Sequence, residues 1–592
     1  MTDVRIVVEW NMSKVSGCLE GVSFLGPKSE NANWLRSEFD RVLDQWFDWR
    51  RALFSEDPSP IPESIRLTPD FLAGQDMLSQ KVRELSDMMT GEVPKYTPRY
   101  IGHMVSELSV PALLGHFVTL LHNPNNTSRD VARVSGRVED EAISMLAAMI
   151  GFDPARAQGH FTSGGTIANF ESVWRARYRM DHSLALGLCI AEKTGEPFDP
   201  VSFAHLGWEA HTALAATHNI TDAELREASG VLGNPFRIAA RITRASGREW
   251  NGPVLLVPGN KHFSWQKAAN VFGLGEEAFW TIGLDRNGRL SLASLREAIE
   301  RAFAAGRPVL AVVTVAGTTE AGEIDPVDGV CDVLDAWRDA GRDIWHHVDA
   351  AWGGFLCSML GGDAGRVLSE HAGRALKAIR RANSVTLDPH KLGYVPYACG
   401  AFLVRDQASY ANSTFAAPYI DRSAPNDRWM MTLEGSRSGS GAAAVWLTGK
   451  TLTFGPQGFG DIMAGTLDSR AYFEQALVSG CRLVRILEPA DSNILCFSLA
   501  KQGEGLAASN ARTRRVFEAF VGDPEFSVSR TELSVANYGA LIDSHLDRYG
   551  GQADCQSLVL IRCVFMNPFW RNPQVRSALM PRFLDRLETH MN

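Results

Sequence analysis

The chain has 592 residues, a length that predicts about four domains, or fewer if one of them is a large α/β unit. Its 45% hydrophobic and 21% charged residues are ordinary for a globular protein and exclude the disordered, collagenous and low-complexity classes. The 59 Lys and Arg residues against 68 Asp and Glu residues give a net charge of −9, so neither a nucleic acid nor an anionic membrane is an expected partner.

Cysteine usage and the first residues indicate a reducing compartment. The nine cysteines are scattered without a CxxC pair, and their odd number argues against a complete disulfide framework. The opening MTDVRIVVEWNMSK lacks the basic start, the long apolar core and the small-residue cleavage site of a secretory signal. The longest apolar runs are under half of the roughly 20 residues that a membrane helix requires. We therefore expect a soluble cytoplasmic protein.

The first long section, residues 30–150, has apolar residues three or four apart among charged ones, a pattern typical of amphipathic helices. The stretch SRDVARVSGRVEDEAISMLAAMIG, residues 128–151, is an example. We expect residues 1–110 to form a helical N-terminal region.

The middle of the chain alternates between short β-rich runs and amphipathic stretches such as SLASLREAIERAFAAG, residues 291–306. This alternation predicts a mainly parallel sheet covered by helices, within a large domain of residues 111–405. The predicted strands are residues 254–257, 309–315, 344–348, 384–387 and 401–404.

Residues 406–445 change character, because Ser, Ala, Pro, Asn and Gly are interleaved with aromatic and charged residues. Such a composition indicates a long connection or a mobile flap. The remainder, residues 446–592, contains a predicted helix at 468–477 and predicted strands at 494–498 and 558–564. These elements suit a smaller C-terminal α/β domain.

Two segments could hold a phosphate and a pyridine ring. TSGGT, residues 162–166, directly precedes a helical pattern, so its amides and hydroxyls would gather at a helix N-terminus that favours an anion; a simple helix cap with flexible glycines is the alternative. Asp349 closes the β-like run IWHHV, where its carboxylate could keep a pyridine nitrogen protonated. Ala350 and Ala351 leave room for a flat ring. An ordinary strand-ending Asp that caps a helix is the alternative there.

Two further segments carry a lysine and a histidine. SVTLDPHK, residues 384–391, ends a predicted strand and places Lys391 in the following turn. A lysine there can form an imine with an aldehyde cofactor if a neighbouring cation or burial lowers its pKa; a surface lysine beside a turn is the alternative. His390 could donate to a phosphate. His262 begins a helix-like run and could lie flat against an aromatic cofactor, whereas a structural histidine is the alternative.

Other cofactor motifs have little support in the sequence. GLGEEA, residues 273–278, matches a dinucleotide fingerprint but follows a helix-like run instead of a strand. The sequence contains no HExxH motif and no Cys and His cluster at zinc spacing. No metal is expected.

Four ordered segments together resemble the group II pyridoxal-phosphate-dependent amino acid decarboxylases: TSGGT, KHFSWQKA, HVDAAWGG and SVTLDPHKLGYVPYACGA. The similarity spans residues 90–450, and the chain shares most with the bacterial tyrosine decarboxylases, through PRYIGHM at 98–104, HNPNN at 122–126 and the DPHKLGYVPY run. The resemblance implies the aspartate aminotransferase-like fold of PLP-dependent transferases, fold type I, with 111–405 as the PLP-binding domain. It also implies a homodimer with the active site at the subunit interface.

The resemblance assigns the chemistry to four residues. Lys391 would bind pyridoxal 5'-phosphate covalently, Asp349 would pair with its pyridine nitrogen, and His262 would stack on its ring. An amino acid would displace Lys391 and lose CO₂. Tyr419, in a loop that closes over the neighbouring subunit's site, would then protonate the α-carbon.

The remaining predicted residues hold the cofactor or line the substrate pocket. His103 and Tyr397 are the pocket candidates, and they could serve aromatic, aliphatic or acidic side chains. We expect decarboxylation of an L-amino acid to its amine, most readily an aromatic one such as L-tyrosine or L-dopa. The alternatives are a glutamate-like substrate, diversion of the reaction to an aldehyde, and a non-catalytic dimer that only binds a partner. The predicted cofactor contacts are Ser163, Gly164, Thr319, Asp349, Ala351, His390 and Lys391.

Overall fold

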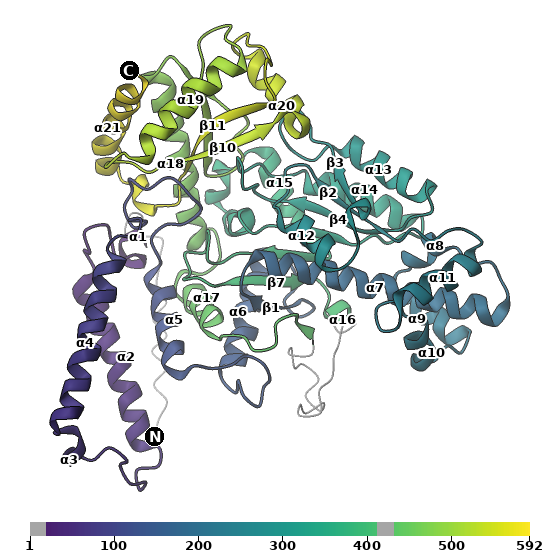
Figure 1. The fold of residues 1–592 in the computed structure, drawn as a ribbon, viewed down its shortest axis with the longest axis horizontal. Helices are drawn as coiled ribbons and strands as arrows, with labels where there is room; N and C mark the ends of the chain where they lie inside the picture. Colours follow the sequence, from purple (N-terminus) through teal and green to yellow (C-terminus); the bar gives the residue numbers. More distant parts are fainter. Residues whose placement is uncertain (1–18, 411–430) are drawn as a thin grey trace.

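Two sheets organise the chain in a computed structural model that describes residues 19–410 and 431–592 (Figure 1). The larger sheet has seven strands in the order β1-β7-β6-β5-β4-β2-β3, and the smaller has four in the order β10-β11-β9-β8. The strands of the larger sheet are β1 (Gln158–Thr162), β2 (Val254–Pro258), β3 (Phe279–Ile282), β4 (Val309–Val315), β5 (His346–Asp349), β6 (Ser384–Leu387) and β7 (Gly400–Val404).

The larger sheet is mainly parallel, as the alternating pattern predicts. The pairs from β3 through β2, β4 and β5 to β6 are all parallel, whereas β7 runs antiparallel to both β6 and β1. All five predicted strands are present, with bounds that differ by at most two residues, and β1 and β3 are additions to them. The carboxyl ends of β4, β5 and β6 therefore meet at one edge, where α/β sheets bind ligands.

Side chains alternate across this sheet. In β2, Leu255 and Val257 pack on one face and Val254 and Leu256 on the other. Because both faces are covered, the strand is an unbroken apolar run. The covering helices are α7 (Gly165–Thr194) and α12 (Ser264–Val271) on the first face, and α13 (Leu292–Ala304) and α14 (Val327–Asp339) on the second.

The smaller sheet is antiparallel throughout and belongs to the C-terminal part of the chain. One face packs against helices, whereas apolar residues of the other face join the core that includes the edge of the larger sheet. The predicted helix at 468–477 lies inside α18 (Phe459–Gly480). The strands of the smaller sheet are β8 (Val484–Ile486), β9 (Ile494–Leu499), β10 (Ser529–Ser534) and β11 (Ser557–Val564), and the other helices of this part are α19 (Leu506–Val521) and α21 (Pro573–Met591).

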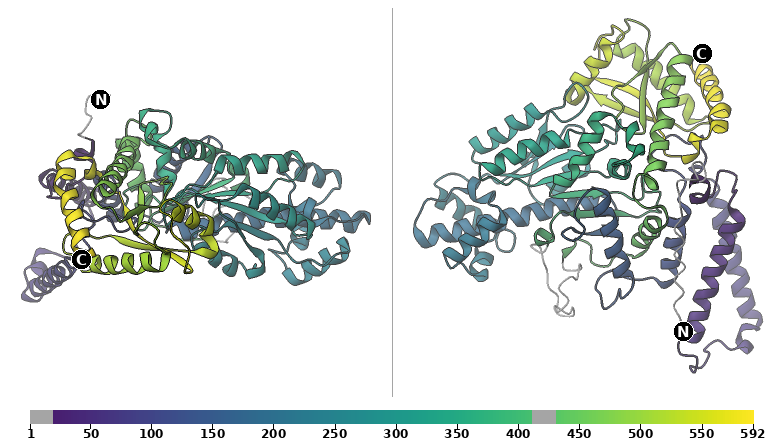
Figure 2. Two further views of the ribbon diagram at one scale, coloured as in Figure 1. Left: turned by 90° about the horizontal axis from the view of Figure 1, so that it is seen from above. Right: turned by 180° about the vertical axis from the view of Figure 1, so that it is seen from behind.

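The N-terminal section is helical. Helices α2 (Ala32–Ala52) and α4 (Pro69–Met89) form a hairpin that projects from the body of the molecule (Figures 1 and 2). The helix predicted over 128–151 begins only at Ser135. The chain just before residue 128 is held by the loop at 435–438, where the Asn126 N–H donates to the Arg437 carbonyl at 2.7 Å. Tertiary contact here overrides the helical pattern.

The predicted flap at 406–445 is only partly described. Helix α16 (Gln407–Tyr410) opens it, and α17 (Ser440–Leu452) begins near its end. Tyr419 lies outside the described residues. In the two described ranges, no helix combines the length and apolar content that crossing a membrane would require.

Candidate active site

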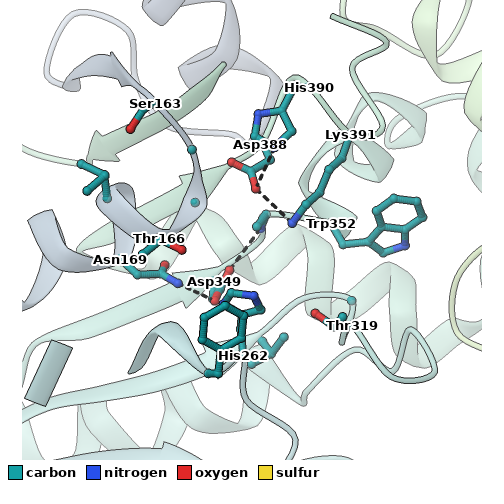
Figure 3. A pocket seen from close by; sticks show the side chains of 17 residues that line it. Ser163, Thr166, Asn169, His262, Thr319, Asp349, Trp352, Asp388, His390 and Lys391 are labelled. Atoms are coloured by element: carbon teal, nitrogen blue, oxygen red, sulfur yellow. Dashed lines mark hydrogen bonds and ion pairs between the residues drawn. The ribbon is translucent and has the colours of Figure 1, made fainter. Parts of the chain in front are cut away.

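A cavity of about 340 Å³ lies at the carboxyl edge of the larger sheet (Figure 3). Its wall comes from the turn before α7, the turn after β2, and the segments that follow β4, β5 and β6. The volume is in the range of small-ligand sites. The cavity brings together eight of the predicted residues: Ser163, Gly164, His262, Thr319, Asp349, Ala351, His390 and Lys391.

Asp349 ends β5 and is 4% exposed. Its Oδ2 accepts a hydrogen bond from Asn169 Nδ2 at 2.8 Å (Figure 3). Oδ2 also accepts one from Trp265 Nε1 at 3.0 Å, and Oδ1 accepts one from the Ala351 N–H at 3.3 Å. These neutral donors fix the carboxylate without neutralising it. Its negative charge can therefore pair with a cationic ring nitrogen of a bound ligand.

His262 follows β2 and is oriented by Ser264. The Ser264 N–H donates to His262 Nδ1 at 3.3 Å, so Nδ1 is the unprotonated nitrogen and Nε2 carries the hydrogen. Burial lowers the pKa of His262, although the nearby Asp349 carboxylate opposes the shift. A neutral imidazole can lie against a flat ring beside Asp349 without adding a second positive charge.

The turn at 162–165 joins β1 to α7 and forms an anion cradle. The first N–H groups of a helix lack the acceptors of a preceding turn and favour a phosphate. In α7 the Ile167 N–H already donates to the Gly164 carbonyl at 3.0 Å, and the N–H groups of Gly165 and Thr166 precede it. The Ser163 N–H is already engaged, since it donates to Glu434 Oε2 at 3.1 Å. A Cβ added at Gly165 would lie 2.8 Å from Asp388 Oδ2, so the turn approaches the end of β6 too closely for another residue.

His390 lies on the cavity wall beside this cradle. Its Nδ1 accepts a hydrogen bond from the Cys399 N–H at 3.2 Å, which leaves the hydrogen on Nε2 as a donor. The Tyr397 ring lies 4.2 Å from the His390 ring, centre to centre. Tyr397 is 59% exposed, and neither it nor His103 lines the cavity. Their predicted contact with the substrate therefore remains a prediction.

The turn after β4 carries Thr319. Gly317 has a φ of 92°, a left-handed conformation that favours glycine, and an added Cβ would lie 2.8 Å from Trp352 Cδ1. Asp325 ties this turn to the segment that bears His262. It accepts from the Val315 N–H at 2.7 Å and from Asn260 Nδ2 at 3.1 Å.

Lys391 stands in the turn after β6, with its Nζ 3.0 Å from Asp388 Oδ2 (Figure 3). Burial lowers the pKa of Lys391, but the carboxylates of Asp388 and Asp349 raise it, and the net shift is upward. This corrects the expectation that a cation or burial lowers the lysine pKa, because the residues nearest the amine are anions.

Three residues that contact Asp349 or Lys391 were not predicted from the sequence: Asn169, Trp265 and Asp388. Asp388 is part of the SVTLDPHK run, and its spacing of three residues from Lys391 was the available indication. Asn169 and Trp265 lie on helices, and nothing in the sequence marks the face that meets Asp349.

The residues of the cavity fit pyridoxal phosphate. The N–H groups at the start of α7 and the Ser163 hydroxyl are available to a phosphate, and glycine at 165 avoids a clash with Asp388. Asp349 suits a protonated ring nitrogen, and Lys391 provides an amine on the same cavity wall. The phosphate, the ring nitrogen and the aldehyde of the cofactor thus each have a partner of complementary chemistry.

The chain is similar to known pyridoxal-dependent decarboxylases. Residues 241–500 match the family model for the pyridoxal-dependent decarboxylase conserved domain. The L-tyrosine decarboxylase of Enterococcus faecium is 28% identical over an alignment that covers 96% of this chain and 98% of that protein. The aspartate 1-decarboxylase of Aliivibrio fischeri is 27% identical over 63% of this chain and 63% of that protein.

A solved structure gives the fold. The crystal structure of Oryza sativa TDC with PLP and tryptamine matches with a TM-score of 0.63 at 17% identity, over 95% of this chain and 99% of that one. The predicted fold type I, with its mainly parallel sheet, is thereby confirmed. The family match over residues 241–500 and the full-length similarity to an L-tyrosine decarboxylase together support a pyridoxal-phosphate-dependent amino acid decarboxylase similar to the bacterial tyrosine decarboxylases, with pyridoxal 5'-phosphate as its cofactor.

Proposed function

We propose that the protein decarboxylates L-tyrosine or a closely related aromatic L-amino acid to the corresponding amine and CO₂. The main observation that supports this reaction is that Lys391, Asp349 and His262 line the same cavity. Similarity to an L-tyrosine decarboxylase over 96% of the chain supports the aromatic substrate.

Each side chain has a proposed task. The bound cofactor supplies an electron sink for the bond that breaks at the α-carbon. Lys391 provides the amine that anchors the cofactor, Asp349 holds the proton on the ring nitrogen, and His262 lies against the ring. The other contacts are Ser163, Gly164 and His390 to the phosphate, Thr319 near the ring oxygen, and Ala351 behind the ring.

Tyr419 is the proposed donor of the proton that the α-carbon receives after CO₂ leaves. It lies in the segment 406–445, whose proposed role is to close over the site and exclude water. A Tyr419→Phe variant should therefore lose most amine formation. Amine release at an unchanged rate would remove Tyr419 from this role.

We also propose a homodimer, with the active site at the interface. The apolar surface of the N-terminal hairpin supports this assembly, because α4 buries none of its residues in a single chain. A contiguous apolar surface in water marks an interaction site. The exposed apolar residues of α4 are Leu72, Met77, Leu78, Val82, Leu85, Met88 and Met89.

We further propose that the protein works in the reducing cytoplasm. The eight cysteines within the described ranges are free thiols, and six of them are buried. Such thiols need no oxidising compartment.

A second candidate is an acidic amino acid substrate. The similarity to an aspartate 1-decarboxylase favours it. A buried cation, Arg562, also favours it, because Arg562 lies near the pocket candidate His103. Burial is the main cause of the lowered pKa of His103, and the charge of Arg562 is the second cause.

Substrate choice is tested by incubating the cofactor-loaded chain with single amino acids: L-tyrosine, L-dopa, L-aspartate and L-glutamate. CO₂, amine and aldehyde are measured together. We expect amine from an aromatic substrate at least about tenfold faster than from an acidic one, a difference of about 1.4 kcal/mol in the barrier. Faster release from aspartate or glutamate would establish the second candidate, and aldehyde in place of amine would contradict both.

A further inference from the structure

Asp388 contacts Lys391 within the turn that follows β6. The carboxylate is 2% exposed, and its Oδ2 lies 3.0 Å from Lys391 Nζ and 3.6 Å from His390 Nε2. Its Oδ1 is buried and has no hydrogen-bond partner within residues 19–410 and 431–592. A carboxylate this deeply buried needs a positive partner, and the ammonium of Lys391 is the nearest one.

The backbone holds this pair together. The Lys391 N–H donates to the Asp388 carbonyl at 2.9 Å, which closes the turn, and Pro389 restricts the backbone between them. On the other side, Gly165 packs so closely that an added Cβ would lie 2.8 Å from Asp388 Oδ2. The carboxylate has little freedom to leave the lysine.

The remaining titratable groups around Lys391 do not replace Asp388. Asp349 raises the lysine pKa less than Asp388 does, and its own oxygens are occupied by Asn169, Trp265 and the Ala351 N–H. His262 and His390 have pKa values lowered mainly by burial, so they are neutral donors or acceptors and not counterions. Tyr397, whose pKa is raised mainly by burial, is a neutral phenol.

We propose that Asp388 is a positioning residue that holds the ammonium of Lys391 whenever this side chain is not bonded to the cofactor. The proposal rests on the proposed function, in which the substrate nitrogen takes the place of the lysine nitrogen. One carbon–nitrogen bond then breaks at Lys391 and another forms at the substrate. The two protons that the substrate ammonium loses end on the lysine, whose NH₃⁺ pairs with Asp388 and does not attack again.

Chemical labelling of the full chain, freed of cofactor, tests this assignment. Formaldehyde with cyanoborohydride methylates neutral amines, and mass spectrometry follows the rate at each lysine. Near neutral pH, Asp388→Asn should speed methylation of Lys391 by at least about tenfold, because loss of an adjacent opposite charge lowers a lysine pKa by about 1–3 units. Lys261, which lies near Glu320 instead, is the internal control and should not change.

Asp406→Asn is the matched variant. Asp406 pairs with Arg156 at 2.8 Å and follows β7, whose antiparallel direction places it at the opposite edge of the sheet. This variant should leave the Lys391 rate unchanged. An Asp388→Asn rate within about twofold of the wild-type rate would overturn the proposal.

Two further measurements test the proposal without relying on the methylation rate of the Asp388→Asn variant. In the wild-type chain, methylation of Lys391 should rise at a higher pH than that of Lys261, and the reverse order would contradict the pairing. In the cofactor-loaded enzyme, Asp388→Asn should raise KM by about tenfold while kcat changes less, since the freed lysine competes with substrate. A merely structural role would lower kcat and stability without changing the labelling. Labelling uses neither cofactor nor amino acid. The Asp388 proposal can therefore be tested by labelling even if the chain shows no decarboxylase activity.

Discussion

Asn169 and Asp349 lie 180 residues apart in the chain, yet the amide of Asn169 donates to the carboxylate of Asp349 at 2.8 Å. The same amide nitrogen lies 3.0 Å from Ser264 Oγ, and the Asn169 carbonyl accepts from Thr386 Oγ1 at 2.8 Å. One side chain on α7 thus connects β5, β6 and the turn that bears His262.

Replacing Asn169 by Ala should weaken cofactor binding. The variant removes a hydrogen bond to a buried charged group, worth about 1.5–3 kcal/mol, so the Kd for pyridoxal phosphate should rise about 10–100-fold. Spectroscopic titration of the cofactor-free chain measures it. Asn270→Ala, an exposed change on α12, is the control. Equal Kd values for the two variants would show that Asn169 does not support the site.

Replacing Gly165 by Ala should damage the anion cradle. The new Cβ would lie 2.8 Å from Asp388 Oδ2, so the turn or the carboxylate must move, at a cost of about 1–3 kcal/mol in the free energy of unfolding. We expect cofactor affinity to fall at least about tenfold. Gly373→Ala is the matched control, because it lies in α15 (Glu370–Ala378) with no atom within 4 Å of the new Cβ. It should be neutral or stabilising. Unaltered cofactor binding by Gly165→Ala would refute the close contact.

Glu323 should make the fold less stable as pH rises. Burial raises the pKa of Glu323 from 4.5 to about 8, and its Oε1 has no hydrogen-bond partner in the described part of the chain. Its stabilising contribution is therefore complete below pH 4.5 and is lost as pH rises through about 8.

The Glu323→Gln variant tests that dependence, since Gln stays neutral. It should match the wild type at low pH and exceed it by about 4 kcal/mol in the free energy of unfolding near pH 8. Urea denaturation at both pH values gives the comparison. Glu370→Gln, whose side chain is 87% exposed, should leave the slope unchanged. A Glu323→Gln profile parallel to that of the wild type would contradict the assignment.

A charge on the exposed face of α4 should weaken the proposed dimer. Leu78 is 65% exposed in a single chain, so Leu78→Glu should not unfold the protomer, but it would bury an unpaired carboxylate at an apolar interface. Light scattering after size exclusion should show a shift from dimer to monomer. Ser79→Glu places the same charge on a neighbouring exposed position. If both variants remain dimeric, α4 lies outside the interface.

The sequence predicted the parallel strands well because burial on both faces leaves an unbroken apolar run. Strand β4 (Val309–Val315) has the predicted bounds, and all seven of its residues are buried. Strand β1 (Gln158–Thr162) was not predicted, because QGHFT carries neither an apolar run nor strict alternation. Its pairing with β7 defines it, and that contact is not local in sequence.

The site was predictable where a residue ends a strand. Asp349 and Lys391 follow β-rich runs, and the edge of a parallel sheet brings such positions together. Asn169 could not be predicted, because its role depends on how α7 is rotated over the sheet.

Every proposed step requires a covalent bond between Lys391 and pyridoxal phosphate, which borohydride reduction of the cofactor-loaded chain can detect. After digestion, mass spectrometry should find the reduced cofactor on the peptide that contains Lys391, and the Lys391→Ala variant should carry none. An unmodified Lys391, or an adduct on another lysine such as Lys261, would contradict the account.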